Sequence, residues 1–174
     1  MARTDPESRR STILDAAFTL FAERGYHAVT MREIAAAVGG STGVLYHWFP
    51  GKEAIFDALL EREVARLVRD AVDAVPESDH REARLAAWVD RHVGRLRDLL
   101  RIALEYARER PEAQPSLAAT VRGIRDAVRD QLGLVDADGI LVRLFGVLVL
   151  GMFDPDAWSA AAVISPLDPV PPRG

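Results

Sequence analysis

The sequence predicts an all-α fold, and three observations support this expectation. Apolar residues recur at three- and four-residue intervals along most of the chain. No stretch alternates apolar and polar residues over the length of a strand, and no hairpin dipeptide separates two β-like runs. Capping residues, glycines and prolines divide the helical pattern. We expect a three-helix N-terminal helix-turn-helix domain followed by a larger helical domain.

The N-terminal helices follow from their start and stop signals. Asp5-Pro6 opens a helix that ends at Gly25. Thr30-Met31-Arg32-Glu33 has the pattern of a capping box, and the short helix after it runs to Val38. Ser41 or Thr42 caps a second short helix through His47 or Trp48. Pro50-Gly51 ends it, and a connecting helix covers about 52–75.

The later helices have less certain boundaries. Leu85 to Tyr106 fits either one kinked helix or two, and Pro111 and Pro115 bracket a loop. Further helices are expected over 116–132, 140–152 and 155–164. Asp136 or Asp138 is expected to cap the 140–152 helix. The proline-rich segment 165–174 is expected to be a disordered tail. The predicted domains are 1–52, continuing into the connecting helix, and 53–164.

Composition narrows the class of protein. The 174 residues are 49% hydrophobic and 28% charged, which suits a globular chain with a sizeable core. The absence of cysteine excludes disulfides, thiolate metal sites and cysteine nucleophiles. No secretory signal is visible, and the longest apolar run is too short to cross a bilayer. We expect a cytoplasmic protein without a membrane partner.

The two short helices have the arrangement of a DNA-reading motif. The first buries Ile34, Ala35 and Val38 to support the second. The second offers hydroxyl, phenol and imidazole groups that suit base edges or phosphates. Its small residues Thr42, Gly43 and Val44 would let the backbone approach the bases closely.

Bulk charge does not explain DNA binding. The net charge is −4, and residues 1–57 carry six cationic side chains against seven acidic ones. Affinity for phosphate depends on where the cations lie. DNA contacts must therefore come from individually placed donors, and the chain's one lysine, Lys52, stands at the start of the connecting helix.

The spacing of the N-terminal residues resembles the DNA-binding domain of the TetR family. The resemblance covers about residues 9–60 and rests on many fixed spacings at once. These residues are Arg10, Ile13-Leu14, Ala16-Ala17, Leu20-Phe21-Ala22-Glu23, Gly25, Thr30-Met31, Ile34-Ala35, Ser41, Gly43, Leu45-Tyr46, Phe49 and Lys52-Glu53.

The resemblance implies roles for individual residues. Thr42, Gly43 and Val44 would face base edges, and Tyr46 and His47 would touch phosphate or base. Lys52 would bind a phosphate beside the helix N-terminus. Contacts to the DNA backbone or flanking bases would come from Thr30 and Arg32, and Ser41 belongs to the same predicted DNA-binding set.

Several of these assignments have alternatives. Tyr46 could pack in the core against the first helix, and Thr30 could serve as a cap alone or in both roles. Gly40 stands where family members usually have an apolar residue, so a looser turn is expected. Trp48 replaces a histidine or small aromatic residue, and either lies on the DNA backbone or packs against the helices.

The second part of the chain is expected to dimerise and to bind a ligand. The 140–152 helix is apolar nearly all round, so another chain or a ligand should cover its excess, unless it is a central helix of one subunit. The predicted dimer interface comprises Leu141, Leu144, Leu148, Met152 and Trp158. The predicted ligand residues are Trp88, His92, Tyr106 and Phe145, each of which also fits a simple core role.

The resulting functional hypothesis is a DNA-binding transcriptional regulator. It is expected to be a homodimeric repressor, released from a palindromic double-stranded DNA operator when an unidentified small-molecule effector binds the C-terminal domain. The alternatives are a ligand-independent helix-turn-helix activator or architectural protein, and a helical enzyme. No enzyme motif, metal-ligand spacing or cofactor-binding motif is present in the sequence, so no cofactor is expected.

Overall fold

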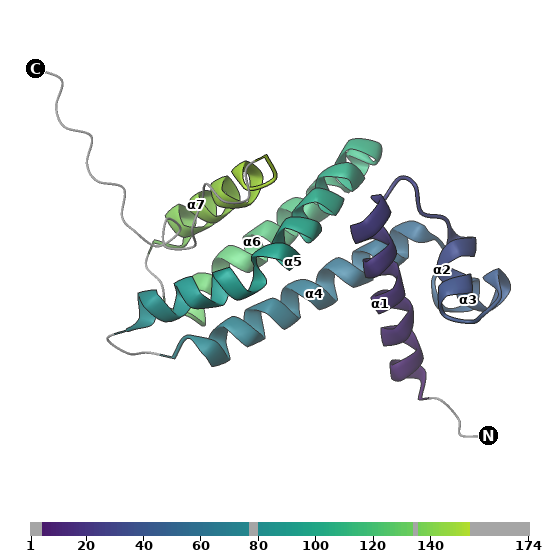
Figure 1. The fold of residues 1–174 in the computed structure, drawn as a ribbon, viewed down its shortest axis with the longest axis horizontal. Helices are drawn as coiled ribbons and strands as arrows, with labels where there is room; N and C mark the ends of the chain where they lie inside the picture. Colours follow the sequence, from purple (N-terminus) through teal and green to yellow (C-terminus); the bar gives the residue numbers. More distant parts are fainter. Residues whose placement is uncertain (1–4, 77–79, 134–135, 154–174) are drawn as a thin grey trace, which may run out of the picture. The chain divides into compact units, whose positions relative to one another are not determined.

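The structure is a computed structural model that describes residues 5–76, 80–133 and 136–153, and all its regular elements there are helical (Figure 1). The all-α fold is confirmed. No helix of this described part is long and apolar enough to cross a membrane. The elements are α1 (Pro6–Arg24), α2 (Met31–Ala37), α3 (Thr42–Trp48), α4 (Lys52–Ala74), α5 (Arg81–Glu109), the 3-10 helix η1 (Pro111–Ala113), α6 (Gln114–Asp130) and α7 (Ala137–Leu150).

The boundaries of α1–α3 have local causes. Pro6 occupies the first turn of α1, and Gly25 ends that helix with a φ of 81° that a side chain would strain. Gly39 takes a φ of 65° and reverses the chain between α2 and α3. The expected helix-turn-helix unit therefore forms over α2 and α3, which pack against each other.

The chain divides into two compact units. The first comprises Met1–Leu67 together with Asp98–Arg122, and the second comprises Val68–Arg97 together with Gly123–Gly174. The first unit therefore combines α1–α3 and most of α4 with the C-terminal part of α5, η1 and the start of α6. Its buried core includes Ile102 and Tyr106 of α5 beside residues of the N-terminal helices.

Tyr26, in the α1–α2 loop, is the centre of this core. Its ring centroid lies 5.3 Å from that of Phe21 in α1, 5.5 Å from Phe56 in α4 and 5.1 Å from Tyr106 in α5. Such tilted and edge-to-face pairs add to the energy of apolar burial. One loop residue thus joins three helices.

The structure refines several sequence-based boundaries. The segment around Leu85–Tyr106 is the single helix α5. Pro111 starts η1, and Pro115 lies within the first turn of α6, so the expected loop between these prolines is helical instead. Proline is tolerated there because amides of the first turn have no partner inside the helix. The expected 155–164 helix, Trp158 and the 165–174 tail lie outside the described residues.

Truncating Ile102 tests whether α5 is part of the N-terminal core. Its side chain is 0% exposed, whereas Leu104, two residues along the same helix, is 50% exposed. We expect Ile102→Ala to lower the free energy of unfolding by about 2–5 kcal/mol in urea titrations followed by circular dichroism. Leu104→Ala should change it by less than about 0.5 kcal/mol. Equal effects of the two variants would contradict this description of the core.

Candidate nucleic-acid interface

Helix α3 has a buried face and an open face. Leu45 is buried, and Trp48 packs against the core of the first unit. Gly43, Val44, Tyr46 and His47 are exposed, with Val44 at 49% and Tyr46 at 52%. The alternative that puts Tyr46 in the core therefore does not describe this structure, whereas Trp48 is half-buried against the helices and its contact with DNA stays a prediction. A short helix with this outward face has the geometry of a recognition helix.

Two capping residues fix where the short helices begin. The Thr30 hydroxyl accepts a hydrogen bond from the Glu33 amide at 3.3 Å, and Glu33 Oε2 accepts from the Thr30 amide at 2.8 Å. This is the capping box expected from the sequence. Ser41 Oγ accepts from the Val44 amide at 3.3 Å and caps α3. The DNA contacts predicted for Thr30 and Ser41 would be additional to these roles.

Glu33 is held in its ionised form. Its pKa is lowered from 4.5 to about 2, first by the side-chain hydrogen bond with Thr30 and then by that with Arg24. The Arg24 guanidinium lies 2.8 Å from Glu33 Oε1 and links the end of α1 to α2. The charge therefore helps to hold α1 against α2, the first helix of the motif.

Gly43 is a glycine that the fold itself does not require. Its φ is not positive, and a Cβ added there would meet only Ser41 Oγ, at 4.0 Å. Glycine inside a helix costs up to about 1 kcal/mol relative to alanine. The missing side chain leaves the N-terminal end of the exposed face of α3 open, which permits close approach of another molecule to the backbone.

Gly40 has a different explanation. A Cβ at this position would lie 3.2 Å from Nη2 of Arg9. The Arg9 guanidinium thus lies beside the space that an apolar side chain at position 40 would fill. The Gly40 amide still donates to the Ala35 carbonyl at 2.9 Å, which holds the turn after α2.

Lys52 is engaged within the protein. Its ammonium donates to the carbonyls of Tyr26 at 2.8 Å and His27 at 3.4 Å, and lies 4.2 Å from the centroid of the Tyr26 ring. Partial burial lowers its pKa, while Glu109 and Glu53 oppose that shift. The phosphate contact predicted for Lys52 stays a prediction. The structure adds a second role, in which Lys52 ties the α1–α2 loop to α4.

The same loop is bound to α5 by groups that the sequence did not indicate. The Tyr26 amide donates to Glu105 Oε2 at 2.7 Å, and Arg101 donates to the Ala22 carbonyl and, at 3.2 Å, to Glu105 Oε1. A Cβ on Gly25 would lie 2.6 Å from Glu105 Oε2. Tyr26 and Glu105 are 79 residues apart in the sequence. Helical spacing relates residues three or four positions apart, so it does not predict a contact over this distance.

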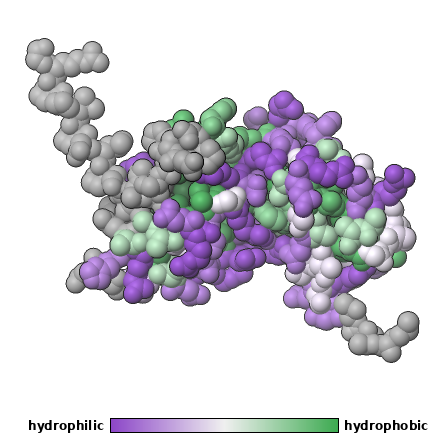
Figure 2. Space-filling view, in the orientation of Figure 1, coloured by the Kyte–Doolittle hydropathy of each residue, from purple (hydrophilic) through white to green (hydrophobic). Residues whose placement is uncertain are grey.

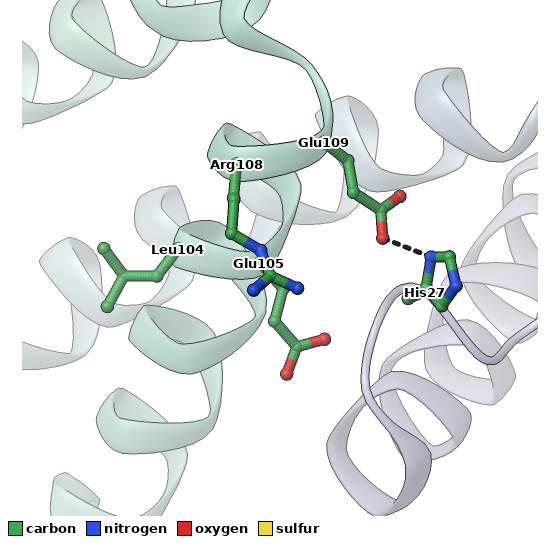
Figure 3. Close-up of a pocket in the computed structure, with 5 residues that line it drawn as sticks. All are labelled: His27, Leu104, Glu105, Arg108 and Glu109. Atoms are coloured by element: carbon green, nitrogen blue, oxygen red, sulfur yellow. Dashed lines mark hydrogen bonds and ion pairs between the residues drawn. The ribbon is translucent and has the colours of Figure 1, made fainter.

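A shallow cavity lies beside this contact. It measures about 350 Å³ and is lined by His27, Leu104, Glu105, Arg108 and Glu109. Figure 3 shows the His27 ring facing the Glu109 carboxylate across it, with a bond from His27 Nδ1 to Glu109 Oε1. The loop before the helix-turn-helix motif therefore contacts two carboxylates of α5, those of Glu105 and Glu109.

The predicted ligand residues fall into two separate groups. Trp88 and His92 stack in the second unit with centroids 4.7 Å apart, and both bond to Asp70 Oδ2, at 2.8 Å and 3.1 Å. Phe145, on α7 of that unit, is exposed. Tyr106 belongs to the first unit and donates to Asp57 at 3.2 Å, and its burial raises its pKa to about 12. Ligand binding by these residues stays a prediction.

The predicted dimer residues differ in exposure. Leu148 is buried, Leu141 and Leu144 are half-buried, and Met152 is exposed. The most exposed apolar side chains of α7 and the turn after it are Val142, at 72%, and Phe153. Figure 2 shows hydrophobic side chains at the surface in the region of α7. The exposed apolar face of α7 thus includes Val142 and Phe145. Each of them directly follows one of the predicted leucines, Leu141 and Leu144.

The fold and the open face of α3 define a helix-turn-helix domain of the kind found in DNA-binding proteins. Residues 13–59 match the model of the family described as bacterial regulatory proteins, tetR family. This N-terminal part of the chain is therefore similar to the DNA-binding domain of the TetR family. This confirms the family resemblance found in the sequence.

Individual relatives match over part of the chain. The transcriptional repressor KstR2 of Rhodococcus jostii is 54% identical over 52 residues, 30% of this chain and 26% of KstR2. The transcriptional activator FasR of Mycolicibacterium smegmatis is 39% identical over 88 residues, 51% of this chain and 40% of FasR. The chain thus spans less than half the length of either relative.

A solved structure matches along most of the chain. The fatty acid degradation regulator FadR from Bacillus halodurans superposes with a TM-score of 0.71 at 22% sequence identity, covering 94% of this chain and 93% of FadR. At this identity the match establishes the shared fold.

The Glu33 charge predicts a specific pH dependence. Because its folded-state pKa of about 2 lies below the ordinary 4.5, ionised Glu33 stabilises the protein above pH 4.5, and this stabilisation is lost as the pH falls toward 2. Glu33→Gln keeps a capping side chain but removes the charge. We expect the variant to unfold more easily than the wild type at pH 6, with the difference shrinking below pH 4.5, as measured by urea titration. A pH-independent difference would contradict this assignment.

Proposed function

We propose that this chain is a DNA-binding transcriptional regulator that reads the major groove with the exposed face of α3. The observation that carries the proposal is the combination of an open backbone at Gly43 with outward Val44, Tyr46 and His47. The proposed contacts also include Thr30, Arg32, Ser41, Thr42 and Lys52. Such a protein would act on double-stranded DNA in the cytoplasm.

We further propose that the regulator is a repressor released by a small-molecule effector. The name of KstR2 as a repressor favours this direction, and the name of FasR as an activator supports activation as the second candidate. The C-terminal part of α5 bonds to the end of α1 through Arg101 and to the α1–α2 loop through Glu105. An effector that moves α5 would therefore move the loop that precedes the helix-turn-helix motif, which is sufficient to change DNA affinity.

We propose a homodimer formed through α7. Val142 and Phe145 expose apolar surface on one face of this helix, and a second copy would bury it. Twofold symmetry would place two copies of α3 about one DNA turn apart, roughly 34–36 Å, on a palindromic operator.

Replacing Gly43 separates folding from DNA binding. Gly43→Ala should raise the free energy of unfolding by up to about 1 kcal/mol, because no atom of the protein obstructs the new Cβ. The same Cβ should lower affinity by roughly tenfold for a duplex selected by the wild-type chain from a random pool, since it stands between backbone and bases. Fluorescence anisotropy at fixed salt measures the affinity.

Gly123 provides the matched control for this experiment. It lies on α6, and a Cβ there meets nothing within 4 Å. Gly123→Ala should stabilise the fold to a similar extent and leave DNA affinity unchanged. Selection of no DNA by the wild-type chain would overturn the proposed function, and unchanged affinity of Gly43→Ala would move the contact surface away from α3.

A charge on α7 tests the proposed dimer. Val142→Asp should convert the dimer to a monomer in light scattering, because it places an unpaired carboxylate in an apolar interface. Val121→Asp, at a 59% exposed position on α6, should leave the mass unchanged. A dimer that persists in Val142→Asp would place the interface elsewhere.

A further inference from the structure

Val44 is the one purely apolar side chain on the exposed face of α3. The other three exposed positions of this helix are Gly43, which has no side chain, and Tyr46 and His47, which end in polar groups. About half of Val44 is exposed. Any molecule that binds the Val44 side chain must therefore do so by apolar contact, because this side chain forms no hydrogen bond.

The fold gives no reason for a valine at this position. Position 44 takes part in the capping of α3 through its backbone amide, which donates to Ser41 Oγ and would do so with any side chain except proline. β-Branched residues are weaker helix formers than alanine. Neither helix formation nor core packing accounts for the exposed isopropyl group.

The major groove contains one apolar group that suits such a side chain. Guanine, cytosine and adenine present hydrogen-bonding groups there, whereas thymine adds its C5-methyl group. Pressing the Val44 methyls against N7, O6 or an amino group would remove water without replacing its hydrogen bonds. Contact with a thymine methyl would bury apolar surface on both sides. The open backbone at Gly43, the preceding residue, permits the required approach.

We propose that Val44 determines operator specificity by reading the C5-methyl group of a thymine in each half-site. This inference rests on the proposed DNA-binding function.

The test removes the methyl group from the DNA. The full-length chain first selects a duplex from a random pool, and each thymine of that duplex is then replaced in turn by deoxyuridine. For the wild-type chain, one thymine in each half-site should show a loss of about fourfold in affinity, the value of one buried methyl group. A cytosine at that position should bind more tightly when it carries a 5-methyl group.

Two variants identify the side chain that senses the methyl group. In Val44→Ala the same deoxyuridine substitution should change affinity by less than about twofold, because most of the apolar contact is already lost. Val121→Ala, at an exposed valine outside α3, should keep the full fourfold effect.

The outcomes distinguish this inference from the function on which it rests. Tight binding with no thymine sensitive to deoxyuridine overturns the role of Val44 and leaves DNA binding intact. A thymine effect that persists in Val44→Ala also overturns it, since another group must then read the methyl. Failure to select any duplex overturns the proposed function itself.

Discussion

The position of the α1–α2 loop is the constraint on which the N-terminal unit depends. Tyr26 fills the space between α1, α4 and α5 with its ring, while its carbonyl accepts from Lys52 and its amide donates to Glu105. Apolar packing and polar contacts therefore fix the same residue. The helix α2 follows this loop directly. Contacts of the loop with α4 and α5 therefore fix the position at which the helix-turn-helix motif begins.

This arrangement explains how an acidic chain can carry a surface suited to DNA. Two carboxylates that contact the motif or the loop before it have partners within the protein: Glu33 bonds to Thr30 and Arg24, and Glu105 to Tyr26 and Arg101. Their charges are thus largely compensated locally, so they repel phosphate less than the net charge of −4 suggests. What remains on the exposed face of α3 is polar or apolar rather than acidic.

The sequence predicted those features that depend on neighbouring residues. The capping box at Thr30 and Glu33, the glycine stop at Gly25 and the open face of α3 all follow from local spacing. The contacts of α5 with the loop did not, because residues near 26 and 105 meet only after the chain has folded. Lys52 shows the same limit. Its place at the start of a helix predicted a phosphate contact. The sequence did not predict that the Tyr26 and His27 carbonyls accept hydrogen bonds from its ammonium group.

Residues that lower the stability of the fold where they stand indicate a role beyond folding. Gly25 and Glu105 are matched to each other, so the glycine is explained by the fold. Gly43 and Val44 are matched to nothing within the protein: one omits a side chain where space is open, and the other exposes apolar surface beside it. A fold optimised for stability alone would reverse both choices. The two residues are adjacent on the same exposed face, which is the expected result if their partner is a surface outside the chain, presented close to the backbone and carrying an apolar group.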